Sequence, residues 1–279
     1  MSDLVLAARA DGAELVVEMA GVPAGTIALT QLDAHDYAMA WHLAPHRPEV
    51  VEQALAGAVE HVFAALGAHR LETRIAAADV ATQRIAARVG LRREGLLRSA
   101  DREQVLMSRI AGDPPVGSAE GFIAMLNAGL PKKRVISQGL LFDEHGRVLL
   151  CELTYKREWD LPGGVVEPGE SPTAGLIREV GEELGLAVEV HGLRTVNWLR
   201  PWNHWDDACV FLFDLGQIPA AASEQMRLQR TEIAAVHWCD DVDVAKRAAA
   251  ATAALLTDLP RTDAAYREGG VAPVLSSRR

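Results

Sequence analysis

A helix bracketed by strong start and stop signals, within residues 161–186 (LPGGVVEPGESPTAGLIREVGEELGL), constrains the fold of this chain more than any other feature. Ser171 is a residue type preferred at helix N-caps, and Pro172 suits the first helical position. Gly185 suits the left-handed residue that follows a helix. The spacing therefore predicts a helix from about Pro172 to Leu184, packed on a sheet formed by the apolar segments around it.

The predicted helix carries a set of carboxylates that an ordinary surface helix would avoid. Successive helical residues turn by about 100°, which places Glu179, Glu182 and Glu183 on one acidic face. An apolar stripe on another side is expected to pack on the sheet, and its members are Ala174, Ile177, Val180 and Leu184. Like charges four residues apart, such as Glu179 and Glu183, disfavour a helix by about 0.2–0.5 kcal/mol. A bound divalent cation would reverse that repulsion, because hard ions such as Mg²⁺ prefer carboxylate oxygens.

The residues from position 164 onward follow the pattern Gly-x5-Glu-x7-Arg-Glu-aliphatic-x-Glu-Glu-x-Gly-aliphatic. The pattern is filled by Gly164, Glu170, Arg178, Glu179, Val180, Glu182, Glu183, Gly185 and Leu186. It resembles the Nudix box at every defining position, and the likeness extends from about residue 135 to 241. The resemblance implies an α/β/α sandwich and a hydrolase that cleaves a nucleoside diphosphate linked to another group, either a nucleotide sugar such as ADP-ribose or a (d)NTP.

The same resemblance implies roles for individual residues. The residues expected to act in catalysis are Glu170, Arg178, Glu179, Glu182 and Glu183. The three glutamates of the acidic face, with the carbonyl of Gly164, would bind Mg²⁺ or Mn²⁺. Arg178 would orient these carboxylates, and Glu170 would pair with it or help to place water. Two glycines at 163 and 164 allow the backbone to approach an ion closely.

The general base and the substrate contacts are less constrained. The base is either Glu183 or a loop residue outside the box, for which the candidates are Asp206, Asp207 and Glu232. The substrate-binding candidates are Trp198, Trp202, Trp205 and Glu232. Planar side chains suit stacking on a nucleobase, although the tryptophans, within residues 197–207 (NWLRPWNHWDD), equally suit a packed loop or an interface.

The first part of the chain follows another pattern, with strands expected within residues 13–45, 70–77 and 91–111 and helices over 48–67 and 79–90. Residues 66–98 resemble the second half of GNAT-family acetyltransferases, in a likeness that covers about the first 110 residues. In that family a glycine-rich loop holds the acetyl-CoA pyrophosphate, whereas HLAPHRPEVVEQAL (residues 42–55) has no glycine, and Pro48 lacks an N–H donor. We therefore expect a degenerate, truncated GNAT-like domain that serves structure or dimerisation.

Two alternatives remain for the whole chain: an active acetyl-CoA-dependent N-acetyltransferase fused to a Nudix enzyme, and a non-catalytic module that senses a nucleotide. The histidines that an acetyltransferase would use as bases are His42, His46, His61 and His69, and each also suits a surface or packing position.

The chain is expected to be α/β (α+β) with four parts: a GNAT-like domain over 1–112, a linker with a short helix over 113–132, a Nudix domain over 133–262 and a C-terminal tail over 263–279, frayed from residue 269. A terminal helix is expected within residues 243–260. The net charge of −10 opposes binding to a long nucleic acid, so we expect a small nucleotide-type ligand. The first residues have no signal peptide and no run is long enough to span a membrane, which favours the cytoplasm. Three widely spaced cysteines suit buried free thiols, and a homodimer is compatible with these features.

Overall fold

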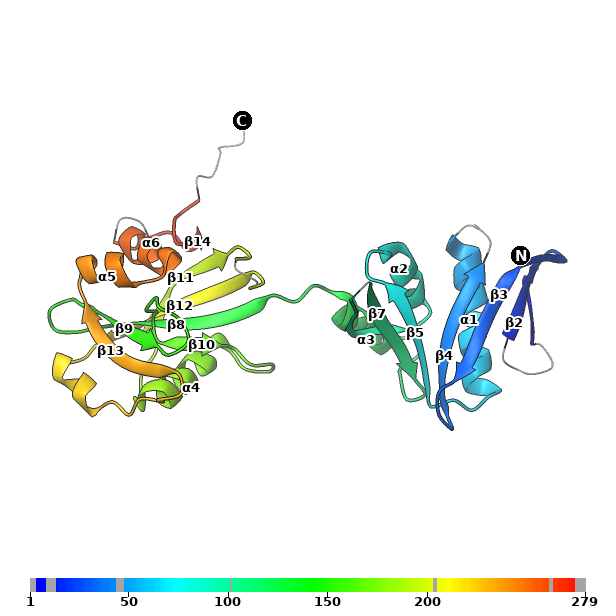
Figure 1. The fold of residues 1–279 in the computed structure, drawn as a ribbon, viewed down its shortest axis with the longest axis horizontal. Helices are drawn as coiled ribbons and strands as arrows, with labels where there is room; N and C mark the ends of the chain where they lie inside the picture. The colour runs from blue at the N-terminus through cyan, green and yellow to red at the C-terminus, as the bar shows by residue number, and fades with distance from the viewer. Residues whose placement is uncertain are drawn as a thin grey trace, which may run out of the picture. The chain divides into compact units, whose positions relative to one another are not determined.

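The computed structural model describes residues 4–8, 14–43, 48–100, 102–202, 205–260 and 263–273. The chain divides into two compact units, Met1–Pro131 and Lys132–Arg279. Each unit is built on one mixed β-sheet with helices, which confirms the expected α/β class (Figure 1). No helix in the described ranges is long and apolar enough to cross a membrane.

The sheet of the first unit has the strand order β1-β2-β3-β4-β5-β7-β6. Its strands are β1 (Leu4–Ala8), β2 (Glu14–Met19), β3 (Val22–Gln31), β4 (Asp36–Leu43), β5 (Arg70–Ala76), β6 (Arg92–Arg98) and β7 (Glu103–Ile110). Its helices are α1 (Pro48–Ala64), α2 (Val80–Arg88) and α3 (Ala119–Gly129). Helix α2 is capped by Asp79, whose carboxylate accepts from the backbone N–H of Thr82 at 3.0 Å. Apolar side chains of α1, such as Leu55 and Val62, share one core with the inner face of the sheet.

Three segments of this unit compare with the sequence as follows. Strand β1, which the sequence analysis did not predict, pairs antiparallel with β2. Helix α3 is the short helix expected within the linker, and it packs against β6. Residues 44–47, which include His46 and part of the stretch without glycine, lie outside the described residues.

The second unit contains the sheet β13-β9-β8-β12-β11-β14, and β10 pairs with β8. Its strands are β8 (Arg134–Phe142), β9 (Val148–Leu153), β10 (Gly163–Val165), β11 (Gly192–Leu199), β12 (Ala208–Gln217), β13 (Ile233–Cys239) and β14 (Tyr266–Glu268). Its helices are α4 (Pro172–Leu184), the 3₁₀ helix η1 (Ala220–Gln225), α5 (Asp241–Arg247) and α6 (Ala250–Asp258). Helix α4 covers one face of the sheet, and α5 and α6 cover the other (Figure 1). Each face therefore has its own apolar core.

The carboxyl-terminal segment differs from its prediction in two ways. The single helix expected within residues 243–260 is broken into α5 and α6, because Ala248 and Ala249 are extended, with ψ of 154° and 146°. The tail contains the short strand β14, which pairs in parallel with β11. The expectation of fraying from residue 269 is wrong for residues 269–271, because their backbone N–H groups donate hydrogen bonds. Asn197 of β11 accepts from the backbone N–H of Gly270 at 2.9 Å, and the fully buried Arg267 donates to Asp258 at 2.9 Å. Hydrogen bonds between distant residues hold this segment in place.

The cysteines are free thiols, as expected, with Cys151 and Cys239 buried and Cys209 half-buried. Burial raises the pKa of Cys239 to about 11, and it also raises the pKa of Cys151. Both buried thiols therefore stay protonated and unreactive at neutral pH.

Candidate active site

Helix α4 begins and ends where its sequence signals predict. The hydroxyl of Ser171 accepts from the backbone N–H of Ala174 at 3.2 Å, and Pro172 is the first helical residue. Gly185 ends the helix in the left-handed conformation, with φ of 63°. These local caps fix the register of the whole box, because every later position on the helix follows from its first residue.

The rotation of α4 about its axis differs from the expected one. The buried side chains are Leu176, Val180, Glu183 and Leu184, whereas Ala174 is exposed and Ile177 is 44% exposed. The prediction for Ala174 and Ile177 is therefore wrong, and Glu183 leaves the predicted acidic surface for the buried side of the helix. The physical reason lies outside the helix: Glu183 finds a hydrogen-bond donor in the strand beneath it.

That donor is the backbone N–H of Gly163 in β10, which lies 3.1 Å from Oε2 of Glu183. The Glu183 side chain is almost fully buried, at 6% exposed for the residue. Burial raises the pKa of Glu183 to about 7, and the negative charges of Glu179, Glu232 and Asp160 add to the rise. A carboxyl that titrates near neutral pH can hold or release a proton under physiological conditions.

Arg178 braces the other carboxylates of the box. Its Nε donates to Oε1 of Glu170 at 3.0 Å, and its Nη1 donates to Glu179 at 3.0 Å and to Glu182 at 3.1 Å. Its Nη2 donates to Oε2 of Glu170 at 3.1 Å and to the carbonyl of Val165 at 3.2 Å. The hydrogen bonds from Arg178 lower the pKa of Glu170. One guanidinium thus gathers three carboxylates of the box around itself.

Glu179 lies against the backbone of Gly164. A Cβ atom added to Gly164 would stand 2.6 Å from the carboxyl carbon of Glu179, so a side chain there would displace the carboxylate. Partial burial raises the pKa of Glu179, against the opposing effect of Arg178. The close approach of a glycine backbone to a carboxylate suits a hard cation, which binds carbonyl and carboxylate oxygens together.

No three acidic, histidine or cysteine side chains within the described ranges already converge on a single point at metal-binding distance. The reason is visible in the contacts: Arg178 bridges Glu179 and Glu182, while Glu183 turns toward Gly163. The donor set nevertheless fits Mg²⁺ or Mn²⁺ in kind, since it consists of carboxylate and carbonyl oxygens.

The loop candidates for the general base separate into two groups. Glu232 lies near the acidic centre, because its charge raises the pKa of both Glu179 and Glu183. Asp207 is instead paired with Lys133 and accepts from the indole N–H of Trp198 at 3.3 Å. The carbonyl of Asp206 accepts from Arg134 at 2.9 Å. Both aspartates therefore lie among the basic and aromatic residues where β8 begins.

The three tryptophans have different surroundings. Trp198 is half-buried on β11, whereas Trp202 is 71% exposed and Trp205 is 60% exposed on the β11–β12 connection. The backbones of Trp202 and Trp205 exchange hydrogen bonds of 3.1 and 2.9 Å, and Arg134 lies 4.6 Å from the ring centroid of Trp205. Arg134 thus already covers one face of the Trp205 ring, whereas the high exposure of Trp202 suits stacking on a planar ligand.

Asp160, which the sequence did not single out, lies beside the candidate site, since its charge raises the pKa of Glu183. It accepts hydrogen bonds from Gln138 at 3.1 Å, Thr252 at 2.9 Å and Lys156 at 2.8 Å. Its only sequence signal is that it directly precedes the segment Leu161–Pro162–Gly163–Gly164, which leads into the box.

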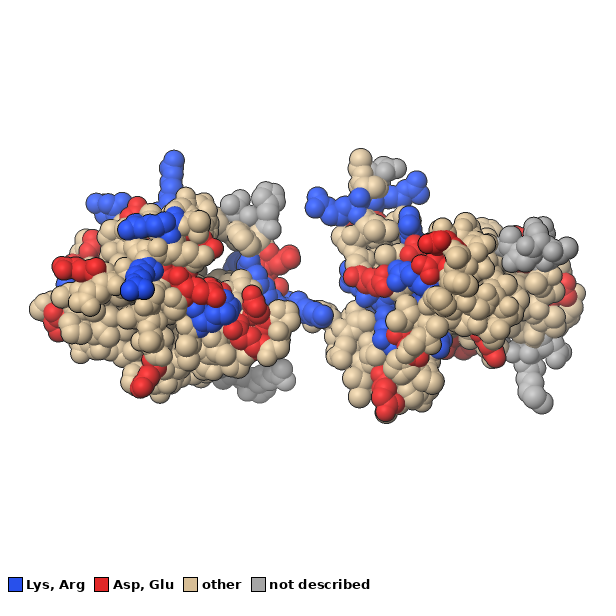
Figure 2. All heavy atoms as spheres, turned by 90° about the horizontal axis from the view of Figure 1, so that it is seen from below, with Lys and Arg blue, Asp and Glu red and all other residues tan. Residues whose placement is uncertain are grey.

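Acidic and basic side chains are interspersed on the face viewed in Figure 2.

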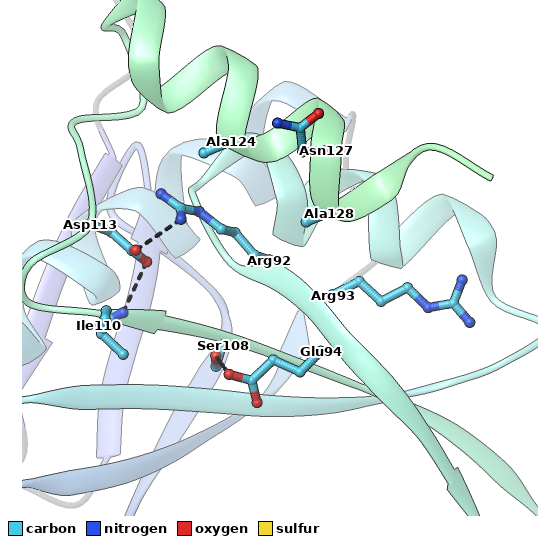
Figure 3. A pocket seen from close by; sticks show the side chains of 9 residues that line it. All are labelled: Arg92, Arg93, Glu94, Ser108, Ile110, Asp113, Ala124, Asn127 and Ala128. Atoms are coloured by element: carbon cyan, nitrogen blue, oxygen red, sulfur yellow. Dashed lines mark hydrogen bonds and ion pairs between the residues drawn. The ribbon is translucent and has the colours of Figure 1, made fainter. Parts of the chain in front are cut away.

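The first unit has a cavity of about 520 Å³ between β6, β7 and α3 (Figure 3). Its carboxylates are already engaged: Arg92 pairs with Asp113 at 3.0 Å, and Glu94 accepts from Arg70 at 2.6 Å and from Ser108 at 2.5 Å. The hydrogen bonds from Arg70 lower the pKa of Glu94 to about 2. Among the histidines considered as bases in the described ranges, His69 stacks on His35 with ring centroids 4.3 Å apart, and Nε2 of His61 is buried without a hydrogen-bond partner.

Comparisons with known proteins agree with the two-part organisation. Residues 132–259 match the model of the NUDIX domain, and residues 3–92 match that of the acetyltransferase (GNAT) domain. The fold and the box thus define the second unit as a Nudix domain. The chain joins an N-terminal GNAT acetyltransferase domain to this C-terminal Nudix domain, as the sequence resemblance predicted.

Individual relatives match only a part of the chain. A MutT-like protein of Streptomyces ambofaciens is 42% identical over 66 residues, which cover 24% of this chain and 43% of that protein. An 8-oxo-dGTP diphosphatase of Proteus vulgaris is 36% identical over 61 residues, which cover 20% of this chain and 54% of that protein. The structure of a MutT NUDIX hydrolase from Burkholderia pseudomallei is 23% identical, with a TM-score of 0.38, and covers 44% of this chain and 94% of that one. The chain thus spans about half the length of these two curated relatives.

Proposed function

We propose that the C-terminal unit is a divalent-metal-dependent pyrophosphohydrolase that cleaves a nucleoside triphosphate by water attack at phosphorus. The observation that carries the proposal is the contact between α4 and the glycine pair of β10, where Glu183 meets the N–H of Gly163 and Glu179 lies against Gly164. A match to the NUDIX model over residues 132–259 supports the same chemistry.

Each residue of the box has a defined task in this proposal. Glu179, Glu182 and Glu183, with the carbonyl of Gly164, hold Mg²⁺ or Mn²⁺, and Arg178 with Glu170 keeps the carboxylates in place. When bound, the ion neutralises phosphate oxygens and acidifies the attacking water. Glu183 or Glu232 accepts the proton of that water. The assignment of Glu183 is supported by its burial and its contact with the backbone N–H of Gly163, and that of Glu232 by its electrostatic effect on Glu183.

The substrate is proposed to be a nucleoside triphosphate rather than a nucleotide sugar. Support comes from the relatives named a MutT-like protein and an 8-oxo-dGTP diphosphatase. Trp198, Trp202 and Trp205 supply the aromatic surface on which a base stacks, with the exposed rings of Trp202 and Trp205 at the β11–β12 connection.

The test is product analysis by chromatography on a panel of (d)NTPs, 8-oxo-dGTP, ADP-ribose and other nucleotide sugars. With Mg²⁺ or Mn²⁺ we expect a nucleoside monophosphate and pyrophosphate from at least one triphosphate, and no products in EDTA. Preferential cleavage of ADP-ribose would transfer the proposal to nucleotide sugars. Absence of turnover across the panel with either metal would remove the hydrolase assignment.

We further propose that the N-terminal unit serves structure or dimerisation rather than acetyl transfer. The support is the stretch of residues 42–55, which contains no glycine and places Pro48 at the start of α1. Calorimetric titration with acetyl-CoA tests this point, and binding at micromolar concentration would restore the acetyltransferase alternative.

A further inference from the structure

The acidic centre of the C-terminal unit offers little free positive charge to a polyphosphate. The carboxylates in and around it are those of Asp160, Glu170, Glu179, Glu182, Glu183 and Glu232. An arginine has five N–H donors, and Arg178 directs all five to Glu170, Glu179, Glu182 and the carbonyl of Val165. Arg178 therefore has no N–H left for a phosphate oxygen.

Lys156, in the loop after β9, is a second cation close to this centre. Its ammonium makes one hydrogen bond within the described residues, to Oδ2 of Asp160 at 2.8 Å. An ammonium group has three donors, so two remain available, and the side chain is 32% exposed. Lys156 thus lies beside Asp160 and has N–H donors that a ligand can reach.

The partner of Lys156 is anchored independently of it. The other oxygen of Asp160, Oδ1, accepts from the backbone N–H of Leu161 at 3.0 Å, from Gln138 at 3.1 Å and from Thr252 at 2.9 Å. These donors come from the loop before β10, from β8 and from α6. Among the described residues, Lys156 is the one hydrogen-bond donor to Oδ2, so its ammonium can move away while Oδ1 keeps three hydrogen bonds.

Asp160 also connects Lys156 to the glycine pair. Its backbone exchanges hydrogen bonds of 2.7 and 3.0 Å with Cys151 of β9, and Gly163 follows three residues later with its N–H on Glu183. The pKa of Tyr155 is raised, first by loss of solvent around its hydroxyl, while Lys156 opposes the rise and Glu183, Asp160 and Glu232 add to it. The Tyr155 hydroxyl therefore lies within electrostatic range of both the Lys156 ammonium and the acidic centre.

We propose that Lys156 is a substrate-binding residue, whose ammonium leaves Oδ2 of Asp160 to bind a phosphate oxygen of a nucleoside polyphosphate. This inference rests on the proposed function. In the free protein the ion pair with Asp160 holds the Lys156 ammonium beside the acidic centre and keeps it from pairing with the carboxylates of the box. In the complex it neutralises charge on the phosphate chain, which Arg178 has no free donor to do.

Steady-state kinetics test the proposal, with the best triphosphate of the panel at saturating Mg²⁺. The variants are Lys156→Met, Lys156→Arg and Arg157→Met. Arg157 is the matched control, because it is the exposed cation next to Lys156. We expect Lys156→Met to raise KM by about tenfold or more, the loss of a charge-assisted hydrogen bond, with kcat changed by less than about threefold. Lys156→Arg keeps the charge and restores most of the affinity, and Arg157→Met matches the wild type.

An unchanged KM in Lys156→Met, or an equal rise in Arg157→Met, would overturn the inference. If the wild type cleaves no nucleotide, the proposed function fails. The role of Lys156 is then decided by calorimetric titration of dGTP, in the presence of Mg²⁺, into the wild type and into Lys156→Met. Weaker binding by Lys156→Met supports the inference, whereas equal affinity or no binding to either protein contradicts it.

Discussion

Replacing Glu183 by glutamine is expected to stabilise the metal-free protein above neutral pH. The carboxyl is 6% exposed, and burial raises its pKa from 4.5 to about 7. Because the native pKa lies above the unfolded one, the unfolded state ionises first as pH rises, and stability falls between about pH 4.5 and pH 7. The rise from 4.5 to about 7 corresponds to a loss of about 3 kcal/mol that is complete above pH 7.

Glutamine has nearly the same shape and keeps an oxygen for the N–H of Gly163, but it does not ionise. The Glu183→Gln protein should therefore lack this loss, and at pH 8 in EDTA it should be more stable than the wild type by up to about 3 kcal/mol. At pH 4.5 or below the two proteins should be similarly stable. Adding Mg²⁺ should stabilise the wild type more than the variant, because ligand binding to the native state adds stability.

Urea unfolding followed by tryptophan fluorescence between pH 4.5 and pH 8 measures this difference. Every tryptophan except Trp41 lies in the second unit, so the signal reports mainly on that unit. With a urea slope of about 2 kcal/mol/M, the midpoints at pH 8 should differ by about 1.5 M. Glu182→Gln is the control, because the Glu182 side chain is 56% exposed. Parallel pH profiles for the wild type and Glu183→Gln would show that the native pKa of Glu183 is not raised.

Three further predictions follow from single contacts. Gly164→Ala places a Cβ 2.6 Å from the Glu179 carboxyl carbon, so metal-activated turnover should fall about 10–100-fold with little loss of stability. The control is Gly181→Ala, which should keep full activity because an added Cβ there meets no atom outside its own helix within 4 Å. Arg178→Gln removes the brace from three carboxylates and should raise the Mg²⁺ concentration for half-maximal rate about 10–100-fold; an unchanged activation curve would contradict the bracing role. Arg267→Met leaves Asp258 without its buried partner and should lower the free energy of unfolding of the second unit by about 3 kcal/mol, while Glu268→Gln, at an exposed position, should have little effect on the urea midpoint.

The sequence predicted those features that depend on neighbours along the chain. Helix α4 is set by Ser171, Pro172 and Gly185, which lie at its own ends, so its bounds were predictable to the residue. The Nudix box is likewise a local pattern. The residues of one loop and one helix carried the resemblance, and residues 132–259 match the model of the same domain.

Features that depend on distant partners were not predictable in the same way. The burial of Glu183 requires the N–H of Gly163, which only the pairing of β10 with β8 brings into place. Asp160, which pairs with Lys156, is held by hydrogen bonds from β8, β9 and α6. The carboxyl-terminal strand was missed because polar residues such as Arg267 suggest a solvated tail until their buried partners are known.

Turnover of Glu183→Gln on the best nucleotide substrate with Mg²⁺ tests whether the acidic residues of α4 form the active site. We expect kcat to fall at least about 10²-fold, since the substitution removes a metal-binding carboxylate and a candidate base, while the circular dichroism spectrum stays that of the wild type. Wild-type turnover in a correctly folded Glu183→Gln protein would contradict the assignment of the site to the acidic residues of α4.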